Sequence, residues 1–333
     1  MGIKGLTPLL KDKAPQSIES ISLSQLRDKR VAIDISIFLY KSLSNVRYNG
    51  DYLRNSQGEI VSHIVGIFQK TIQYLSVGIQ PLYIFDGKPP EEKRECIKER
   101  NQKVEECKQK MQSEEITQHE KQKLEKGTIR LTKQHIDDVK HLFDLMGIPY
   151  IHNNVGEAEA YAAELCRLGY VEAVVTEDMD TLAYGCPKMI RNCIDRTIKR
   201  KDVVSCFSYE SLLSGFDVTP EQFVDICILC GCDYCPTIPK VGPIRAFQYI
   251  KQYGSIESMI ESGKFTISEG FKERFEKSRE LFQIFRDKID LTALPLHSSE
   301  KNLLGLKQYL IEGCNMGETK VNNAIKTGYR ITQ

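Results

Sequence analysis

The stretch Val31-Ala32-Ile33-Asp34 decides the fold of this chain, because it is a short apolar run that ends in an acidic residue. The same pattern returns at Leu82-Tyr83-Ile84-Phe85-Asp86, and again at Ala173-Val174-Val175, which runs on to Asp178 and Asp180. Compact apolar runs of this length are typical of strands buried on both faces of a parallel sheet. Helical patterns separate the three runs, as crossovers between parallel strands require. The sequence therefore predicts an α/β fold with a central, mostly parallel sheet flanked by helices.

Three other segments carry helix signals. After Thr132, a suitable N-cap, apolar residues recur at helical spacing as far as Gly147, where such a helix is expected to end. Thr219, with a proline after it and a glutamine three positions on, predicts another helix start. Residues 91–126 hold good helix formers but only seven apolar residues in 36. We interpret them as an arm that leaves the sheet, and a solvated pair of surface helices is the alternative.

The composition excludes several classes of protein. A chain of 333 residues with 41% apolar residues can bury a full core, and its 11 cysteines show no disulfide spacing. No apolar run approaches the roughly 18 residues of a membrane span, and residues 1–6 do not resemble a secretory signal. The net charge is only +1, from 46 basic and 45 acidic residues, which at first argues against a polyanionic partner.

Seven acidic residues are predicted to meet at one edge of the sheet. In open α/β sheets, ligands bind outside the carboxyl ends of the strands, where the three apolar runs place their acids. A predicted helix start at residues 156–160 adds two acids, and the segment after the helix at 223–230 adds one. A single acid in such a place is often a turn residue or a favourable charge at a helix start. The candidates are Asp34, Asp86, Glu157, Glu159, Asp178, Asp180 and Asp233.

Converging carboxylates repel one another unless protons or cations neutralise them. Oxygen ligands select hard cations, so we expect Mg²⁺, for which Mn²⁺ is expected to substitute. Seven carboxylates are better explained by two ions roughly 4 Å apart, which clamp an in-line displacement at phosphorus. Without these seven, 38 acidic residues remain against 46 basic ones. We therefore interpret the net charge of +1 as the sum of a basic surface and a cluster of acidic residues that it surrounds.

Six motifs in order resemble the flap structure-specific endonucleases of the xeroderma-pigmentosum-G superfamily. The resemblance runs from residue 1 to about residue 254, and the motifs are Met1–Leu6, Val31–Asp34, Phe85–Pro90, Gly156–Ala160, Thr176–Asp180 and Gly231–Cys235. It implies a 5′-nuclease or PIN-like core with a helical arch and a helix-hairpin-helix DNA-binding element. It also implies that the chain removes 5′ flaps at single-strand/double-strand junctions with the help of two metal ions, and that it has 5′→3′ exonuclease activity. The pathways that the resemblance implies are Okazaki fragment maturation and long-patch base excision repair.

The resemblance also assigns roles to single residues. It implies that the seven acids hold the metal ions and that Lys93 and Arg100 of the arm steer the scissile phosphate. It also implies a K⁺ ion at the hairpin turn, where the family usually has a glycine and this chain has Lys240. Lys70 stands where many relatives have arginine. The implied DNA contacts are Gly2, Tyr40, Arg47, Lys70, Arg191, Gly231, Lys240, Gly242 and Arg245.

The expected organisation is one nuclease core in two halves, residues 1–105 and 131–254. An arm at 106–130 separates the halves, a helix-hairpin-helix occupies 234–251, and a helical segment follows at 255–333. From the resemblance we expect a monomer that binds branched DNA with a 5′ flap and does not bind a membrane. Its expected location is the nucleus, with the mitochondrion as a further location. A sliding clamp is an expected partner, although the segment with which the family binds it is not visible in these 333 residues.

Three alternatives stay open at this point. The first is a related 5′→3′ exonuclease or junction nuclease of the same superfamily. The second is a phosphatase of the haloacid-dehalogenase type, because Asp178–Thr181 resembles that family's strand-end aspartate motif with the threonine one position early. The third is a DNA-junction binder without catalytic activity. Residues 188–201 are locally basic and fit either a solvated hairpin or a rim that follows phosphates.

Overall fold

The structure is a computed structural model that describes residues 2–48, 50–111, 117–195 and 197–330. Its centre is an eight-stranded sheet in the order β1-β9-β8-β7-β2-β5-β6-β10. The strands are β1 (Ile18–Ser22), β2 (Arg30–Asp34), β5 (Gln80–Phe85), β6 (Tyr150–His152), β7 (Ala173–Val175), β8 (Lys188–Asn192), β9 (Val203–Ser208) and β10 (Leu296–His297). A separate two-stranded ribbon pairs β3 (Arg47–Tyr48) with β4 (Asp51–Tyr52).

The three predicted strands form the middle of the sheet, as expected. β2 lies between β5 and β7 and runs parallel to both, with Ile33 opposite Tyr83 on one side and Val175 on the other. The sheet is mixed at its edges, because β9 pairs antiparallel with β1 and β8, and β10 pairs antiparallel with β6. The basic segment 188–201 thus begins as a strand of this hairpin, whose Met189 and Ile190 are buried.

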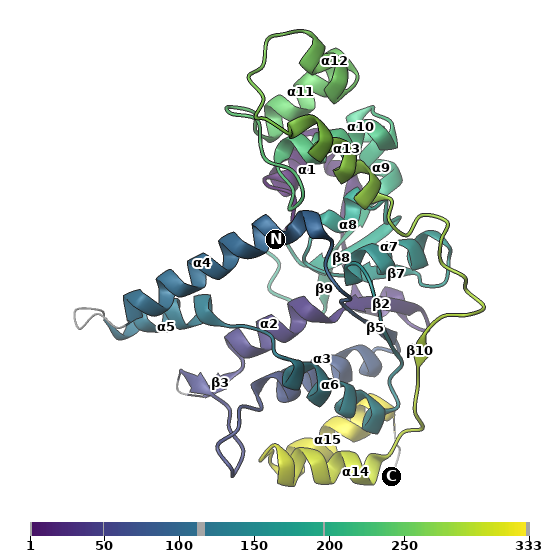
Figure 1. The fold of residues 1–333 in the computed structure, drawn as a ribbon. Coiled ribbons are helices and arrows are strands. Elements are labelled where there is room, and N and C mark those ends of the chain that lie inside the picture. The colour runs from purple at the N-terminus through teal and green to yellow at the C-terminus, as the bar shows by residue number, and fades with distance from the viewer. Residues whose placement is uncertain (1, 49, 112–116, 196, 331–333) are drawn as a thin grey trace.

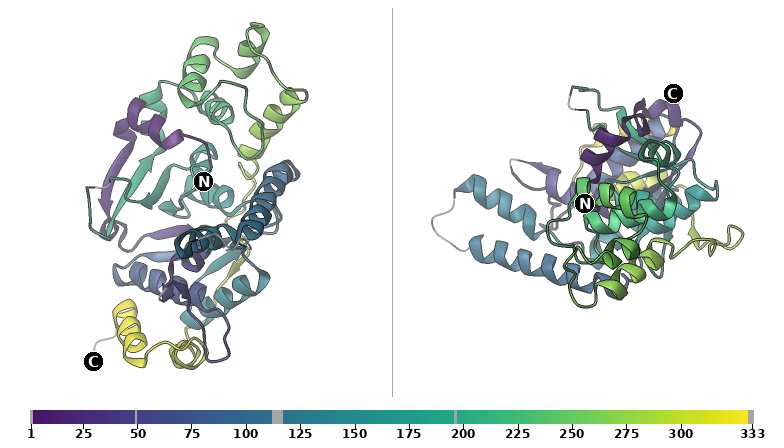
Figure 2. Two further views of the ribbon diagram at one scale, coloured as in Figure 1. Left: turned by 90° about the vertical axis from the view of Figure 1, so that its left-hand side faces the viewer. Right: turned by 90° about the horizontal axis from the view of Figure 1, so that it is seen from above.

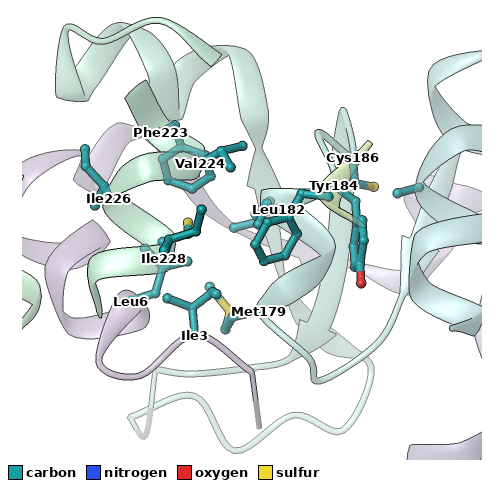
Figure 3. Packing of buried hydrophobic residues seen from close by; sticks show 14 of the residues in the cluster. Ile3, Leu6, Met179, Leu182, Tyr184, Cys186, Phe223, Val224, Ile226 and Ile228 are labelled. Carbon is teal, nitrogen blue, oxygen red and sulfur yellow. The ribbon is translucent and has the colours of Figure 1, made fainter. Parts of the chain in front are cut away.

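Side chains alternate across the sheet and build one core on each face, as the pleat requires. Ala32 and Leu82 face the first core, whereas Ile33 and Tyr83 face the second. The helices that supply the first core include α1 (Leu6–Lys13), α7 (Ala158–Arg167), α8 (Asp180–Ala183), α9 (Tyr209–Phe216) and α10 (Pro220–Cys230). Figure 3 shows α1 and α10 packing here through Leu6, Phe223 and Ile228. The second core is covered by α2 (Ile35–Asn45), α3 (Ser62–Ser76), α6 (Lys133–Met146) and α15 (Glu318–Tyr329).

The two predicted helix starts are confirmed. Thr132 caps α6 in a capping box, and the helix ends at Gly147 in the left-handed conformation (φ 67°). Thr219 caps α10 in the same way, with Gln222 as its partner and a proline in the first turn.

The arm is a pair of helices that projects from the body of the molecule (Figures 1 and 2). A short 3-10 turn at Glu91–Lys93 leads into α4 (Arg94–Met111), and α5 (Gln118–Thr128) returns beside it. Val104 is the only residue of α4 that is buried, which fits the polar composition. The boundary expected between residues 105 and 106 falls inside α4, which runs without a break from Arg94 to Met111.

The segment at 255–333 is divided between the two ends of the molecule rather than forming one unit (Figure 1). Its first helices, α12 (Ile256–Glu261) and α13 (Phe271–Phe282), pack against α10 and α11 (Pro243–Tyr253). The chain then passes along the sheet edge as β10. It ends with α14 (Leu303–Gln308), a π turn at Tyr309–Gly313 and α15, which packs on α3. Short 3-10 turns lie at Pro15–Ser17 and Leu23–Leu26, and no described helix meets the length and hydropathy of a membrane span.

A buried ion-pair network joins α10, α12 and α13. Two nitrogens of Arg279 each lie 2.7 Å from an oxygen of Asp225, which is only 2% exposed, and Glu257 contacts the same guanidinium. Arg279→Ala is expected to lower the free energy of unfolding by about 3 kcal/mol, because Asp225 would stay buried without its cation. Urea denaturation measures the change, with Lys277→Ala on the exposed side of the same helix as a control. Equal effects of the two substitutions would contradict this account.

Candidate active site at the carboxyl edge of the sheet

Asp34 lies at the centre of the predicted edge. It is the last residue of β2 and the N-cap of α2, and it is only 2% exposed. Its Oδ1 accepts a hydrogen bond from the Ser36 amide at 3.0 Å, and its Oδ2 accepts one from the Thr176 hydroxyl at 3.1 Å. Burial, together with the charges of Asp86 and Asp178, raises the pKa of Asp34 to about 7. The carboxylate is therefore held in place at a considerable electrostatic cost.

Asp86 follows β5 and contacts the start of α7, which carries Glu157 and Glu159. Asp86 accepts a hydrogen bond from the Ala158 amide at 2.8 Å, and the Ser36 hydroxyl contacts its other oxygen. Glu157 is the N-cap of α7 and Glu159 lies in its first turn. Because Glu157 stands outside the helix with an extended backbone, the two glutamates are not bound to the i, i+2 geometry of a regular helix.

Asp178 and Asp180 follow β7, and the N-terminal segment lies against them. Oδ1 of Asp178 accepts a hydrogen bond from the Asp180 amide at 3.1 Å, whereas the buried Oδ1 of Asp180 has no partner among the described residues. Burial and the charge of Asp178 raise the pKa of Asp180 well above its usual range. Gly2 has a positive φ of 82°, and a Cβ there would collide with both carboxylates. Only glycine permits this close approach.

The arm places two cations over the seventh acid. Arg100 donates a hydrogen bond to Oδ2 of Asp233 at 2.7 Å, and Nζ of Lys93 lies 3.3 Å from the same oxygen. Lys93 also contacts Oε1 of Glu157. Burial alone would raise the pKa of Asp233, but Lys93 and Arg100 hold it below its usual range. Both cations therefore face the same way from the arm, toward the acidic edge.

The donor set fits a hard divalent cation. All seven acids offer oxygen ligands, Asp180 has an unused buried oxygen, and burial raises the pKa values of Asp34, Glu159 and Asp178. Such a cluster is stabilised by added positive charge. Within the described parts of the chain, no three of these groups already surround a single point as a finished metal site. Lys93, between Glu157 and Asp233, supplies part of the neutralising charge instead.

A cavity of about 720 Å³ opens above the carboxylates, under the arm. Asp34, Asp86, Glu159 and other acids line one side of it. The cavity is also lined by cations and by apolar or aromatic residues, most of them from the arm and from α2. These residues include Ile37, Tyr40, Lys41, Lys93, Arg100, Lys103, Val104, Ile129, Arg130 and, from β8, Arg191. The cavity can therefore accept a polyanionic ligand that also carries flat apolar groups.

Tyr40 and Arg47 lie at the base of the arm. The Tyr40 ring is 39% exposed, and its hydroxyl donates to the backbone carbonyl of Lys126 at 3.0 Å. Arg47 lies 3.3 Å from a carboxylate oxygen of Glu125 and stacks over the Tyr52 ring at 4.1 Å. Its side chain is 9% exposed, so in this arrangement Arg47 docks α5 and is not open to DNA.

Lys70 and Arg191 are less free than the sequence suggested. Burial and the nearby charge of Lys41 lower the pKa of Lys70 to about 8, and its ammonium lies 4.8 Å from the centre of the Tyr74 ring. Arg191 donates to the Thr7 hydroxyl at 3.0 Å and lies 3.4 Å from Glu177. Arg191 borders the cavity, whereas Lys70 does not line it.

The turn at Lys240 and Gly242 lies between α10 and α11, near the top of Figure 1. Lys240 is exposed and takes the left-handed conformation (φ 64°) that glycine favours, so the missing glycine does not prevent the turn. Its carbonyl accepts a hydrogen bond from Arg245 at 2.7 Å. Gly242 is the N-cap of α11. Gly231 instead ends α10, and its carbonyl accepts a hydrogen bond from the Lys4 amide at 3.1 Å.

Several functional contacts were missed from the sequence. Ser36 and Thr176 orient Asp34, and both lie within two residues of a predicted acid, which is a usable signal. Tyr234 follows Asp233 directly and contacts Glu157. Tyr184 also approaches Glu157, but a tyrosine after an apolar stretch resembles any core residue, so no pattern pointed to it.

Comparison with known proteins agrees with this geometry. The family model described as the XPG N-terminal domain matches residues 1–107, and the one described as the XPG I-region matches residues 147–233. The sheet, its acidic edge and the arm thus define a metal-dependent nuclease of the XPG type. Flap endonuclease 1 of Ostreococcus lucimarinus is 40% identical over 96% of this chain and 83% of the relative. The chain belongs to the flap endonuclease 1 family.

Further relatives support the assignment. Flap endonuclease 1 of Entamoeba histolytica is 39% identical over 98% of this chain and 87% of that protein. The solved structure of flap endonuclease-1 from Methanococcus jannaschii has a TM-score of 0.68, with 26% identity over 96% of this chain and 97% of that one. The catalytic core of Rad2 in complex with a DNA substrate has a TM-score of 0.69, with 25% identity over 95% and 97% of the two chains.

Proposed function

We propose that this chain cleaves 5′ flaps where single-stranded DNA meets a duplex, and that it also acts as a 5′→3′ exonuclease. One observation carries the proposal: seven carboxylates gather at the carboxyl edge of the sheet, and Lys93 and Arg100 reach them from the arm. Cleavage of a phosphodiester requires oxygen ligands that hold the metal ions, and it requires positive charge where negative charge develops on the phosphate. The cavity between sheet and arm offers both to one phosphate.

Two Mg²⁺ ions, with Mn²⁺ as a substitute, would activate water and neutralise charge at the phosphate when bound. The residues that would hold them are Asp34, Asp86, Glu157, Glu159, Asp178, Asp180 and Asp233. The chain itself contributes orientation: Ser36 and Thr176 fix Asp34, and the Ala158 amide fixes Asp86. Lys93 and Arg100 would exchange their carboxylate partners for the scissile phosphate.

The DNA is proposed to extend from this site in two directions. Tyr40, exposed at the base of the arm, would stack on a base near the junction. The turn at Lys240 and Gly242 would hold duplex phosphate through its backbone and Arg245, and the same turn would hold the proposed K⁺ ion. Gly2, Arg47, Lys70, Arg191 and Gly231 remain proposed contacts, and Arg47 would first have to leave Glu125.

Affinity for a flap substrate is expected to depend steeply on salt. Leaving out Arg47, which pairs with Glu125, six proposed DNA contacts are cations: Lys70, Lys93, Arg100, Arg191, Lys240 and Arg245. Six such contacts predict a loss of roughly 10³-fold in affinity between 50 and 200 mM salt. Fluorescence anisotropy with Ca²⁺ in place of Mg²⁺ measures the loss, and the same titration in EDTA should give weaker binding. A salt-independent affinity would contradict the proposed interface.

The activity itself is tested by incising a 5′-labelled flap with Mg²⁺ present. The proposal predicts oligonucleotide products cut near the junction and no release of phosphate from p-nitrophenyl phosphate. Turnover of p-nitrophenyl phosphate without incision would favour the haloacid-dehalogenase alternative. Degradation only from 5′ ends of nicked duplex would favour a 5′→3′ exonuclease of the same superfamily.

The cellular setting follows as a further proposal. An enzyme of this kind would act in the nucleus, and in the mitochondrion where replication also leaves flaps, during Okazaki fragment maturation and long-patch base excision repair. We propose a monomer that works with a sliding clamp. We also propose that the halves at 1–105 and 131–254, corrected for the earlier start of the arm, fold as one nuclease core.

A further inference from the structure

Two buried tyrosines, Tyr184 and Tyr234, contact the carboxylate of Glu157. The Tyr234 hydroxyl donates a hydrogen bond to Oε2 of Glu157, and the Tyr184 hydroxyl lies 3.3 Å from the same oxygen. The two phenol oxygens are also hydrogen-bonded to each other. Tyr234 is 3% exposed and Tyr184 is 9% exposed, so no bulk water competes for these contacts.

A count of protons shows what this arrangement favours. Each phenol has one proton to donate, and an ionised carboxylate oxygen accepts without donating. The two phenol protons have enough acceptors among these oxygens, because Tyr234 donates to Oε2 of Glu157 and Tyr184 can donate to Oε2 or to the Tyr234 oxygen. The pair therefore occupies Oε2 of Glu157. Oε1 is left to face Lys93, on the side where a metal ion would bind.

Helix α13 packs against Tyr184 and Tyr234. The Phe282 ring, at the end of α13, lies 5.3 Å from the Tyr184 ring and 5.5 Å from the Tyr234 ring, nearly edge-on to both. In Figure 3 the Tyr184 ring stands at the edge of the apolar cluster that includes Leu182. These edge-on contacts help to hold each phenol in one orientation.

Helix α13 also contacts the arm, which carries Lys93 on the other side of Glu157. Arg274 of α13 makes a two-pronged contact with Glu95, which lies two residues after Lys93. Lys93 in turn contacts Oε1 of Glu157. The helix α13 is therefore placed to position both oxygens of one carboxylate, although it contributes no side chain to the acidic cluster.

We propose that Tyr184 and Tyr234 are positioning residues that, backed by Phe282, hold the Glu157 carboxylate in the orientation needed to bind a divalent ion. The inference rests on the proposed metal-binding role of Glu157. It adds residues that act through that carboxylate rather than on the DNA. Outer hydrogen-bond partners of metal ligands commonly account for 10–100-fold in metal affinity or activity, about the size expected here.

The test measures Mn²⁺ binding to the full chain by loss of the free-ion EPR signal. Tyr184→Phe and Tyr234→Phe should each weaken Mn²⁺ binding about 10-fold and raise the Mg²⁺ concentration for half-maximal single-turnover cleavage similarly. The double variant should lose less than the product of the two, because the phenols share one network. Phe282→Leu, which keeps both hydroxyls but loosens their packing, should show a smaller loss of the same kind.

Tyr329→Phe is the matched control, because it removes a phenol that donates to the Met146 carbonyl at 2.6 Å near the opposite end of the molecule. It should leave Mn²⁺ binding unchanged. The inference is overturned if Tyr184→Phe and Tyr234→Phe bind Mn²⁺ like the parent chain, or if they lose only thermal stability in EDTA, as Tyr329→Phe would. A parent chain that fails to incise flaps would instead refute the proposed function, so the two failures are distinguishable.

Discussion

Asp180→Asn is expected to reduce flap cleavage by more than about 10³-fold while leaving DNA binding in Ca²⁺ within a few-fold of the parent chain. Removing a direct ligand should cost more than the ~10–100-fold that outer hydrogen-bond partners contribute. The amide keeps the shape of the side chain, and its Oδ1 position makes no hydrogen bond in the described structure that could be lost. Asp86→Ala is expected to behave in the same way, and single-turnover incision with saturating enzyme measures both.

The same variant has a second expected property in the absence of metal. Burial raises the pKa of Asp180 well above its usual range, so the ionised side chain destabilises the folded state at neutral pH. Replacing it by asparagine should therefore not lower the melting temperature in EDTA, although the increase caused by Mg²⁺ should shrink. Asp290→Asn, an exposed change, serves as the control for both measurements. Near-normal cleavage by Asp180→Asn would show that the metal-binding assignment is wrong.

Lys93→Ala is the second large expected effect. We expect a loss of about 10²–10³-fold in the single-turnover rate with only a small loss in affinity, because a preorganised cation stabilises charge that develops in the transition state. In the structure this cation is buried against Glu157 and Asp233, at the acidic edge and not on the outer face of the arm. The parallel measurement is anisotropy in Ca²⁺, where chemistry is blocked.

Lys98→Ala provides the matched control, because it removes the same charge from the same arm, at an exposed position in the first turns of α4. It should change the rate by less than about twofold. If Lys93→Ala weakens binding as much as it slows cleavage, Lys93 is a general phosphate contact and does not steer the scissile phosphate. If Lys98→Ala slows cleavage as much as Lys93→Ala, the effect belongs to the charge of the arm as a whole.

The middle of the sheet and its acidic edge could be predicted because they depend on local patterns. The runs ending at Asp34 and Asp86 became β2 and β5, and parallel strands must end on the same side. The helix caps at Thr132 and Thr219 were predictable for the same reason, since capping depends on residues three positions apart.

What could not be predicted depends on contacts between distant segments. β9 pairs with β1 across most of the chain, and nothing near Ile18 indicates an antiparallel partner. Arg47 looked free in the sequence, yet Glu125 and Tyr52 cover it because α5 returns over the β3–β4 ribbon. The role of α13 was likewise invisible, since Phe282 has the pattern of an ordinary core residue.

The most direct measurement compares four substrates under one condition: a 5′ flap, a nicked duplex, a bubble and a four-way junction, each with Mg²⁺ and with EDTA. The account predicts that the 5′ flap is cut fastest, at its junction, and that EDTA abolishes every product. Equal or faster cutting of the four-way junction or the bubble would contradict it, as would incision that persists in EDTA.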